Sequence, residues 1–253
     1  MKAAIQNAPQ KEAPRASHEQ PAPLFVPVAA TETGASVALP QPFPIALRNS
    51  LAFAFSAILS PYLVIPVGTF VIVASQQDKK RQFLLWTALS ILFSTVIPAL
   101  YVVIQIVRGK ITDVHVMERE QRGGPFLVAV VSSAVGAWIL YHIGAPPQVW
   151  GIGVVLLFNG IVLSWITSFW KISMHVAVLS ATVLAAIIMI QGVPWWSLVW
   201  MIPALMWARA TRGRHSLWQG IAGCGVSCAI TGAVFYLVPR LWPLVERAID
   251  RFT

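Results

Sequence analysis

The chain has 253 residues, of which 57% are hydrophobic and only 11% are charged, and its mean hydropathy is +0.71. So few polar residues cannot cover a soluble globule, and the composition therefore predicts an integral membrane protein. The formal charge of +9 comes from Lys and Arg in short stretches between apolar runs. That distribution favours anchoring at the membrane surface and binding of anionic head groups, and it argues against nucleic acid as a partner.

Residues 1–45 form a tail that differs in composition from the rest of the chain. They hold eight of the eighteen prolines, no Trp and no periodic apolar run. Such a segment cannot bury enough surface to offset the entropy of ordering, so we expect it to be disordered. It also lacks the apolar core of a secretory signal peptide, because the first hydrophobic run begins only about fifty residues into the chain.

Seven apolar segments follow, each judged against the ~20 residues that a helix needs to cross a bilayer core. The sequence therefore predicts an all-α fold, a polytopic membrane helix bundle with about seven transmembrane helices. Pro61 and Pro66 predict a kink in the first of them. The segments are residues 51–75, 83–107, 126–143, 149–169, 172–190, 195–208 and 217–237.

Counting crossings predicts which polar segments can meet. With seven spans, the loop 108–125 and the junctions at Lys171 and at 209–215 emerge on one side of the membrane, together with the N-terminal tail. The turns at 76–82, 144–148 and 191–194 lie on the other side and contain no histidine. The polar clusters of the first side are therefore the candidates for a shared site.

The remaining segments complete the predicted domain organisation. Residues 46–239 form the transmembrane domain, and residues 240–253 place apolar side chains at helical spacing, which predicts an amphipathic helix on the membrane surface. Cys224 and Cys228 are four residues apart inside an apolar span, which favours a packing role over a metal or redox pair.

The first polar cluster lies in the loop 108–125. Arg119 and Arg122 are three residues apart, so on a helix they would share a face and could hold one phosphate between two guanidinium groups. The alternative is a solvated interfacial loop in which Glu118 and Glu120 pair with these arginines.

The second cluster opens the fifth apolar segment. Lys171 and His175 are one helical turn apart, with Ser173 between them. These residues could contribute to a phosphate site. Alternatively, the lysine extends to the interface and the histidine caps or packs the helix.

The third cluster follows the sixth segment. Arg209, Arg212, His215 and Gln219 are spaced by three, three and four residues, which is one helical stripe. Gln219 can accept a hydrogen bond from one ring nitrogen of His215 and leave the other free to attack an electrophile. The alternative is a basic turn that binds lipid head groups.

At these residues the chain resembles the type 2 phosphatidic acid phosphatase and vanadium haloperoxidase superfamily. Arg209, five residues and His215 reproduce the spacing of its third motif, with Gln219 in place of an aspartate. Ser173 and His175 match the second motif. The first motif is matched loosely by Arg122 followed by Pro125, and the whole pattern is similar to a prokaryotic branch of the family.

This resemblance implies a phosphatase that acts on a lipid phosphate or an isoprenoid diphosphate in the prokaryotic cytoplasmic membrane, without a metal or other cofactor. His215 would attack phosphorus to form a phosphohistidine, and His175 would protonate the departing alcohol. Phosphate oxygens would be bound by a set of donors, namely Arg119, Arg122, Arg209 and Ser173. To these we add Lys171, because it lies one turn from His175.

Two alternatives stay open at the level of the sequence. Gln219 cannot stabilise an imidazolium as a carboxylate does, so the chain could be a weak or inactive member that binds lipid or serves as a structural membrane subunit. The other alternative is an intramembrane prenyltransferase, because the pattern of Arg119, Arg122 and Pro125 after an acidic loop also resembles that group. Which lipid is bound, and which membrane face carries the site, are left open.

Overall fold

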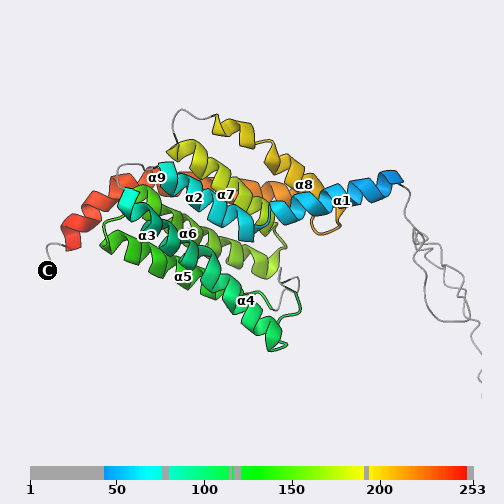
Figure 1. Ribbon diagram of the computed structural model, residues 1–253, viewed down its shortest axis with the longest axis horizontal. Coiled ribbons are helices and arrows are strands. Elements are labelled where there is room, and N and C mark those ends of the chain that lie inside the picture. Colours follow the sequence, from blue (N-terminus) through cyan, green and yellow to red (C-terminus); the bar gives the residue numbers. More distant parts are fainter. Residues whose placement is uncertain (1–42, 76–79, 114–115, 117–120, 191–193, 250–253) are drawn as a thin grey trace, which may run out of the picture. The chain divides into compact units, whose positions relative to one another are not determined.

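The computed structural model describes residues 43–75, 80–113, 116, 121–190 and 194–249. Within these ranges every regular element is a helix, as predicted (Figure 1). The elements in chain order are α1 (Phe43–Ile58), α2 (Pro61–Ser75), α3 (Lys80–Ile91), the π-helix η2 (Leu92–Val96), α4 (Ile97–Val107), α5 (Gly123–His142), α6 (Pro147–Phe169), α7 (Met174–Met189), the 3-10 helix η3 (Trp195–Leu198), α8 (Met201–Thr211) and α9 (Leu217–Ile249). Nearly all of the predicted tail, and Arg119, lie outside the described residues.

Four helices in the described part are long and apolar enough to cross a membrane, and α1 with α2 makes a fifth if the bent pair is one span. The predicted count of seven is therefore not confirmed. Helix α7 has 16 residues and α8 only 11, fewer than the ~20 of a full crossing. The predicted span at 195–208 is divided, because η3 ends at Leu198 and α8 begins at Met201.

The first predicted span is a bent pair of helices. α1 already begins at Phe43, and the chain bends by 50° between Ile58 and Pro61. A proline disfavours helical geometry in the residue before it, which explains why the helix breaks at this point. Pro66, in contrast, lies inside α2 without ending it.

The second predicted span is one continuous helix, residues 82–107, with a π-helical turn in its middle. Pro98 follows that turn and has no N–H to give to the preceding residues. The carbonyl of Phe93, five residues earlier, instead accepts a hydrogen bond of 2.5 Å from Ser132 Oγ. This bond ties the distorted segment to α5.

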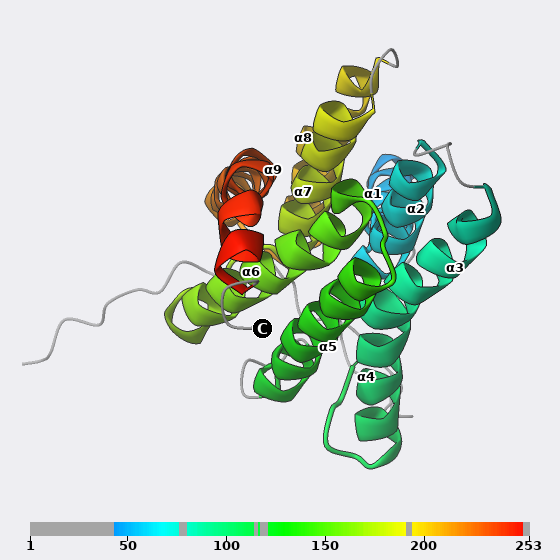
Figure 2. The same ribbon diagram turned by 90° about the vertical axis from the view of Figure 1, so that its left-hand side faces the viewer.

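Close helix pairs form the centre of the bundle. α5 lies beside α6 and α7 beside α9 (Figures 1 and 2). Small residues allow these approaches: a Cβ on Gly153 would lie 2.9 Å from Ala137 Cβ, and one on Gly223 would lie 2.8 Å from the Ser173 carbonyl oxygen. The site junctions at Ser173 and at the start of α9 are thereby brought together.

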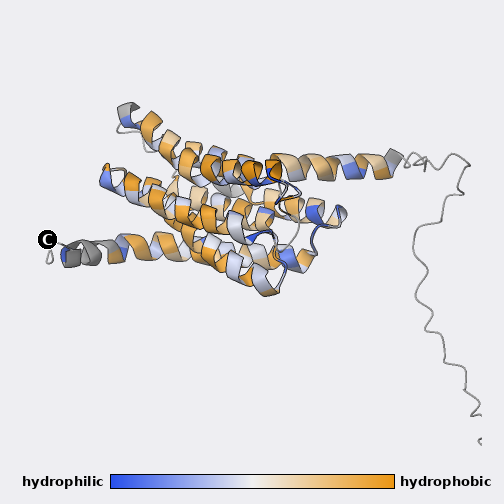
Figure 3. Cartoon of the chain, turned by 90° about the horizontal axis from the view of Figure 1, so that it is seen from below, coloured by the Kyte–Doolittle hydropathy of each residue, from blue (hydrophilic) through white to orange (hydrophobic). Residues whose placement is uncertain are grey.

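The outer surface of the helices is apolar. Side chains such as Leu84, Trp138 and Trp165 are exposed by 72%, 62% and 67%. Figure 3 shows apolar residues along the helices and hydrophilic ones chiefly near their ends. This arrangement suits a protein surrounded by lipid.

The chain after Pro239 is not a separate helix. α9 continues through Pro239 to Ile249, although only Leu217–Leu241 has the composition of a span. Whether residues 240–253 lie on a membrane surface stays a prediction.

Candidate functional site

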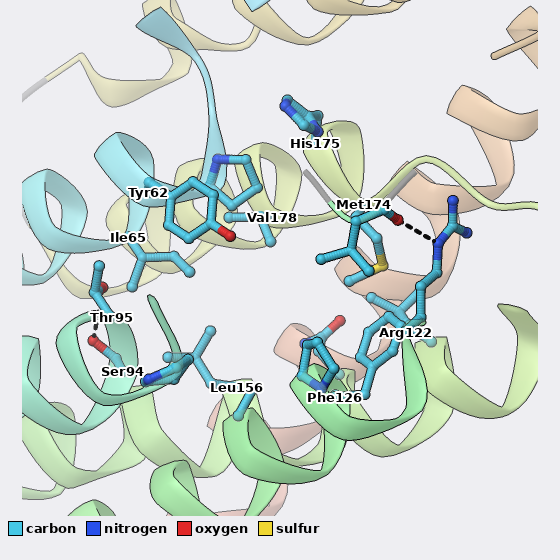
Figure 4. Close-up of a pocket in the computed structure, with 18 of the residues that line it drawn as sticks. Tyr62, Ile65, Ser94, Thr95, Arg122, Phe126, Leu156, Met174, His175 and Val178 are labelled. Atoms are coloured by element: carbon cyan, nitrogen blue, oxygen red, sulfur yellow. Dashed lines mark hydrogen bonds between the residues drawn. The ribbon is translucent and has the colours of Figure 1, made fainter. Parts of the chain in front are cut away.

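A cavity of about 240 Å³ opens among the helices where the predicted clusters meet (Figure 4). Four candidate residues from separate parts of the chain line it, namely Arg122, His175, Arg209 and His215. Most of the remaining wall is apolar and comes from α2, α4, α5, α6 and α7. In Figure 4, Tyr62 and Ile65 lie on one side of the cavity and Arg122 on the other. The cavity thus combines cations and imidazoles with room for an apolar group.

The hydrogen bonds of Gln219 determine which nitrogen of His215 carries the proton. Gln219 Oε1 lies 3.1 Å from the backbone N–H of Ser216, which can only donate, so this oxygen must be an acceptor. His215 Nδ1 lies 3.1 Å from the same oxygen. Nδ1 must therefore donate, and in the neutral ring the lone pair belongs to Nε2. The predicted hydrogen bond between Gln219 and His215 is therefore present.

The surroundings of His215 keep its ring neutral. Burial is the main reason that its pKa falls from the usual 6.5 to about 4, and the charge of Arg209 is the second. The hydrogen bond with Gln219 raises the pKa, whereas the charges of Lys171 and Arg122 lower it further. Near neutral pH, His215 therefore has an unprotonated nitrogen surrounded by three cations.

Arg209 is a buried charge at the cavity wall. Its side chain is only 5% exposed, near the end of α8. Its one hydrogen bond to another described side chain is a long contact of 3.4 Å from Nη1 to Ser56 Oγ, and its Nε has no partner among the described residues. A guanidinium buried in this way is costly unless an anion pairs with it.

Arg122 is positioned by the loop before α5. Its Nε donates to the carbonyl of Val116 at 2.9 Å. Val116 has a positive φ of 45°, which is rare for a β-branched residue. The loop is further held by Gln121, whose Oε1 accepts bonds from the backbone N–H and hydroxyl of Thr112 at 3.1 and 3.2 Å. Arg119, predicted to act with Arg122, is not among the described residues.

Of the second cluster, only His175 lines the cavity. His175 is 6% exposed and lines the cavity from the first turn of α7. Ser173 is fully buried and is not among the lining residues, but its backbone N–H donates to the Gln219 carbonyl at 3.2 Å. Lys171 is exposed and acts on His215 through its charge. The second and third clusters are thus joined through their backbones.

Several lining residues were not predicted from the sequence. Tyr62, Ser94, Thr95 and Ser133 carry no distinguishing pattern in an apolar chain. Asn159 does carry a signal, because an amide in the middle of an apolar span is costly and marks a candidate for function.

No protein-family model, curated protein or solved structure matches the chain. Among the described residues, no group of three or more His, Cys, Asp or Glu side chains could hold a metal ion. The candidate site is therefore interpreted from its own geometry.

Proposed function

We propose that the protein is a membrane-embedded phosphatase that hydrolyses a lipid phosphate or an isoprenoid diphosphate through a phosphohistidine. The observation that carries the proposal is the buried, incompletely partnered Arg209 in one cavity with His215, whose Nε2 holds the lone pair. Arg209 would bind an anion, and the apolar wall would receive the lipid chain.

The proposed reaction has two steps, and each residue of the site has a role in them. The Nε2 lone pair of His215 attacks phosphorus, the bond from phosphorus to the leaving oxygen breaks, and His175 protonates that oxygen. Water then attacks the phosphohistidine, gives a proton to His175, and releases inorganic phosphate and the His215 lone pair. Arg209 and Arg122 offset the charge that develops on the phosphoryl oxygens.

We also keep the proposal of seven spans, in the cytoplasmic membrane of a prokaryote. The lengths of α7 and α8 leave two arrangements, two short crossings or a pair that enters and returns. Both put the Lys171 junction and the start of α9 on the same side, as a shared cavity requires.

The test is phosphate release by purified protein in detergent with a metal chelator present, on phosphatidic acid and on an isoprenoid diphosphate. His215→Ala should reduce release by about 10³-fold or more. His142→Ala is the matched control, because His142 is exposed at the other end of α5 and bonds to the Trp138 carbonyl. With a ³²P-labelled substrate, an alkali-stable phosphoprotein should form in the wild type and in His142→Ala, but not in His215→Ala. Equal release by wild type and His215→Ala would exclude the proposal.

The neutral Gln219 supports a second candidate, a lipid-phosphate-binding protein with little or no turnover. In that case the lipid phosphate should raise the melting temperature of wild type and His215→Ala alike, with no release from either. The prenyltransferase alternative requires clustered acidic residues for magnesium diphosphate, and the described part of the chain offers no such cluster.

A further inference from the structure

A second cavity, of about 40 Å³, lies between α2, α6, α7 and α9. It adjoins the candidate site, because Ile65, Leu156, Asn159, Leu163 and Val178 line both cavities. No charged side chain is among the residues that line the second cavity. Its chemistry is therefore separate from that of the arginines and histidines.

Four polar side chains line this second cavity, namely Thr69, Asn159, Thr182 and Ser227, and all of them except Thr182 are buried. Thr69, Asn159 and Ser227 are exposed by 2%, 6% and 0%. Thr69 Oγ1, Asn159 Oδ1 and Ser227 Oγ have no hydrogen-bond partner among the described residues. The Asn159 amide is oriented by its Nδ2, which donates to the Val155 carbonyl at 3.0 Å, so the oxygen is the atom left to be satisfied.

These groups lie where unsatisfied polar atoms are most costly. Asn159 and Ser227 belong to the middle third of α6 and of the apolar part of α9, and Thr69 of α2 lines the same cavity. At this depth in a bilayer no bulk solvent can satisfy them, so a partner must come from within the bundle.

The size and chemistry of the cavity select the partner. A water molecule needs a cavity of ~10–15 Å³ and two to four polar partners. The second cavity, of about 40 Å³, offers both. A cation would need a compensating negative charge, and the lining residues provide none. We propose that the cavity is an internal hydration site, in which water bridges Thr69, Asn159 and Ser227 and so connects α2, α6 and α9.

The neighbouring residues are consistent with this site. The small side chains of Ala177 and Ala181 line the cavity and leave space between the helices. Since Asn159 also lines the first cavity, the bound water would stabilise the wall against which a ligand of the candidate site packs. The hydration site does not depend on the proposed phosphatase activity.

The direct test is hydroxyl-radical labelling by X-ray radiolysis, with exchange into ¹⁸O-water, on the full chain in detergent. Val155 and Ile72 are 5% and 2% exposed and line only the second cavity. Val176 and Ile202 are 0% and 8% exposed and line neither cavity, so they are the matched controls. Labelling of Val155 and Ile72 several-fold above their controls is expected. Labelling no greater than that of the controls would overturn the proposal.

Variants test which side chains hold the water. The combined Thr69→Val and Ser227→Ala change should reduce the labelling of Val155 and Ile72 to the level of the controls. Thr167→Val is the control variant, because Thr167 Oγ1 is a buried hydroxyl of α6 without a partner among the described residues, yet Thr167 lines neither cavity. Unchanged labelling in the double variant would overturn the assignment of these residues.

Discussion

At the scale of single residues, the amide of Gln219 is the group that orients His215. Its oxygen is fixed as an acceptor by the Ser216 N–H and thereby fixes the His215 tautomer. In the proposed reaction, a neutral amide contributes little to stabilising the cationic ring that forms when Nε2 of His215 bonds to phosphorus. Gln219 therefore orients His215 but does not supply the charge stabilisation that a carboxylate would add.

Substitution of Gln219 should separate these two contributions. Gln219→Glu adds a negative charge beside Nδ1, so it should raise the pKa of His215 and increase phosphate release if charge stabilisation limits the rate. Gln219→Leu removes the acceptor and should reduce release by about 10²–10⁴-fold. NMR titration of His215 together with release assays would measure both effects. Similar activity in the wild type and the leucine variant would contradict this role for Gln219.

The lowered pKa of His215 predicts a dependence on pH. The folded protein protonates His215 only near pH 4, whereas the unfolded chain does so near pH 6.5. Between these values the unfolded state binds more protons, so stability should fall as the pH falls through this range and then level off. His215→Gln should reduce that slope in denaturant titrations, and an unchanged slope would argue against the pKa shift.

Arg209→Met should increase the stability of the ligand-free protein and decrease its binding of a lipid phosphate. Replacing a buried, incompletely paired charge by an apolar side chain of similar length should stabilise the ligand-free protein by about 1–4 kcal/mol. The same change should abolish the stabilisation that a lipid phosphate gives to the wild type. Thermal unfolding with and without the lipid would measure both. Loss of stability in the ligand-free variant would show that Arg209 has a structural partner.

At the scale of elements, the close contact between α7 and α9 positions the site. The Ser173 N–H donates to the Gln219 carbonyl, and Gly223 allows the Ser173 carbonyl to approach α9. The prediction from the sequence put these segments on one side of the membrane. It could not detect the contact, because a glycine in an apolar run has no unique meaning in the sequence.

Gly223→Ala tests that contact. The new Cβ would lie 2.8 Å from the Ser173 oxygen and force the helices apart, so stability and phosphate release should both decrease. Gly225→Ala is the control on the same helix, because its Cβ would meet no atom within 4 Å and should only improve helix propensity. Equal effects of the two changes on the melting temperature would show that helix proximity is not the cause.

The helix boundaries predicted from the sequence agree with the structure where glycine and proline mark a turn. The predicted segments 126–143 and 149–169 correspond closely to α5 (Gly123–His142) and α6 (Pro147–Phe169), which are separated by a Gly-Ala-Pro-Pro turn. The predicted segment 195–208 failed as a continuous helix. Its apolar residues are divided between η3 and α8, and hydropathy alone cannot distinguish a 3-10 turn from a helix.

At the scale of the whole molecule, the open question is whether α7 and α8 each cross the membrane. Cysteines introduced as Lys110→Cys, Lys171→Cys and Ser216→Cys, in a background without Cys224 and Cys228, should react with an impermeant maleimide from the same side. Ser197→Cys, at an exposed position between α7 and α8, should react from the opposite side if there are seven spans. Reaction from the same side would show that the pair enters and returns.

The sequence by itself determined the helical class, the membrane character and the three clusters, because hydropathy and spacing are local properties of the chain. It also predicted the hydrogen bond between Gln219 and His215, although the predicted helical stripe from Arg209 to Gln219 is interrupted, because α8 ends at Thr211 and α9 begins at Leu217. The tertiary structure alone decided that Arg122, His175, Arg209 and His215 share one cavity, and that the Ser173 hydroxyl does not line it. Burial of Arg209 and the lowered pKa of His215 likewise follow from packing between distant segments, which no single stretch of sequence encodes.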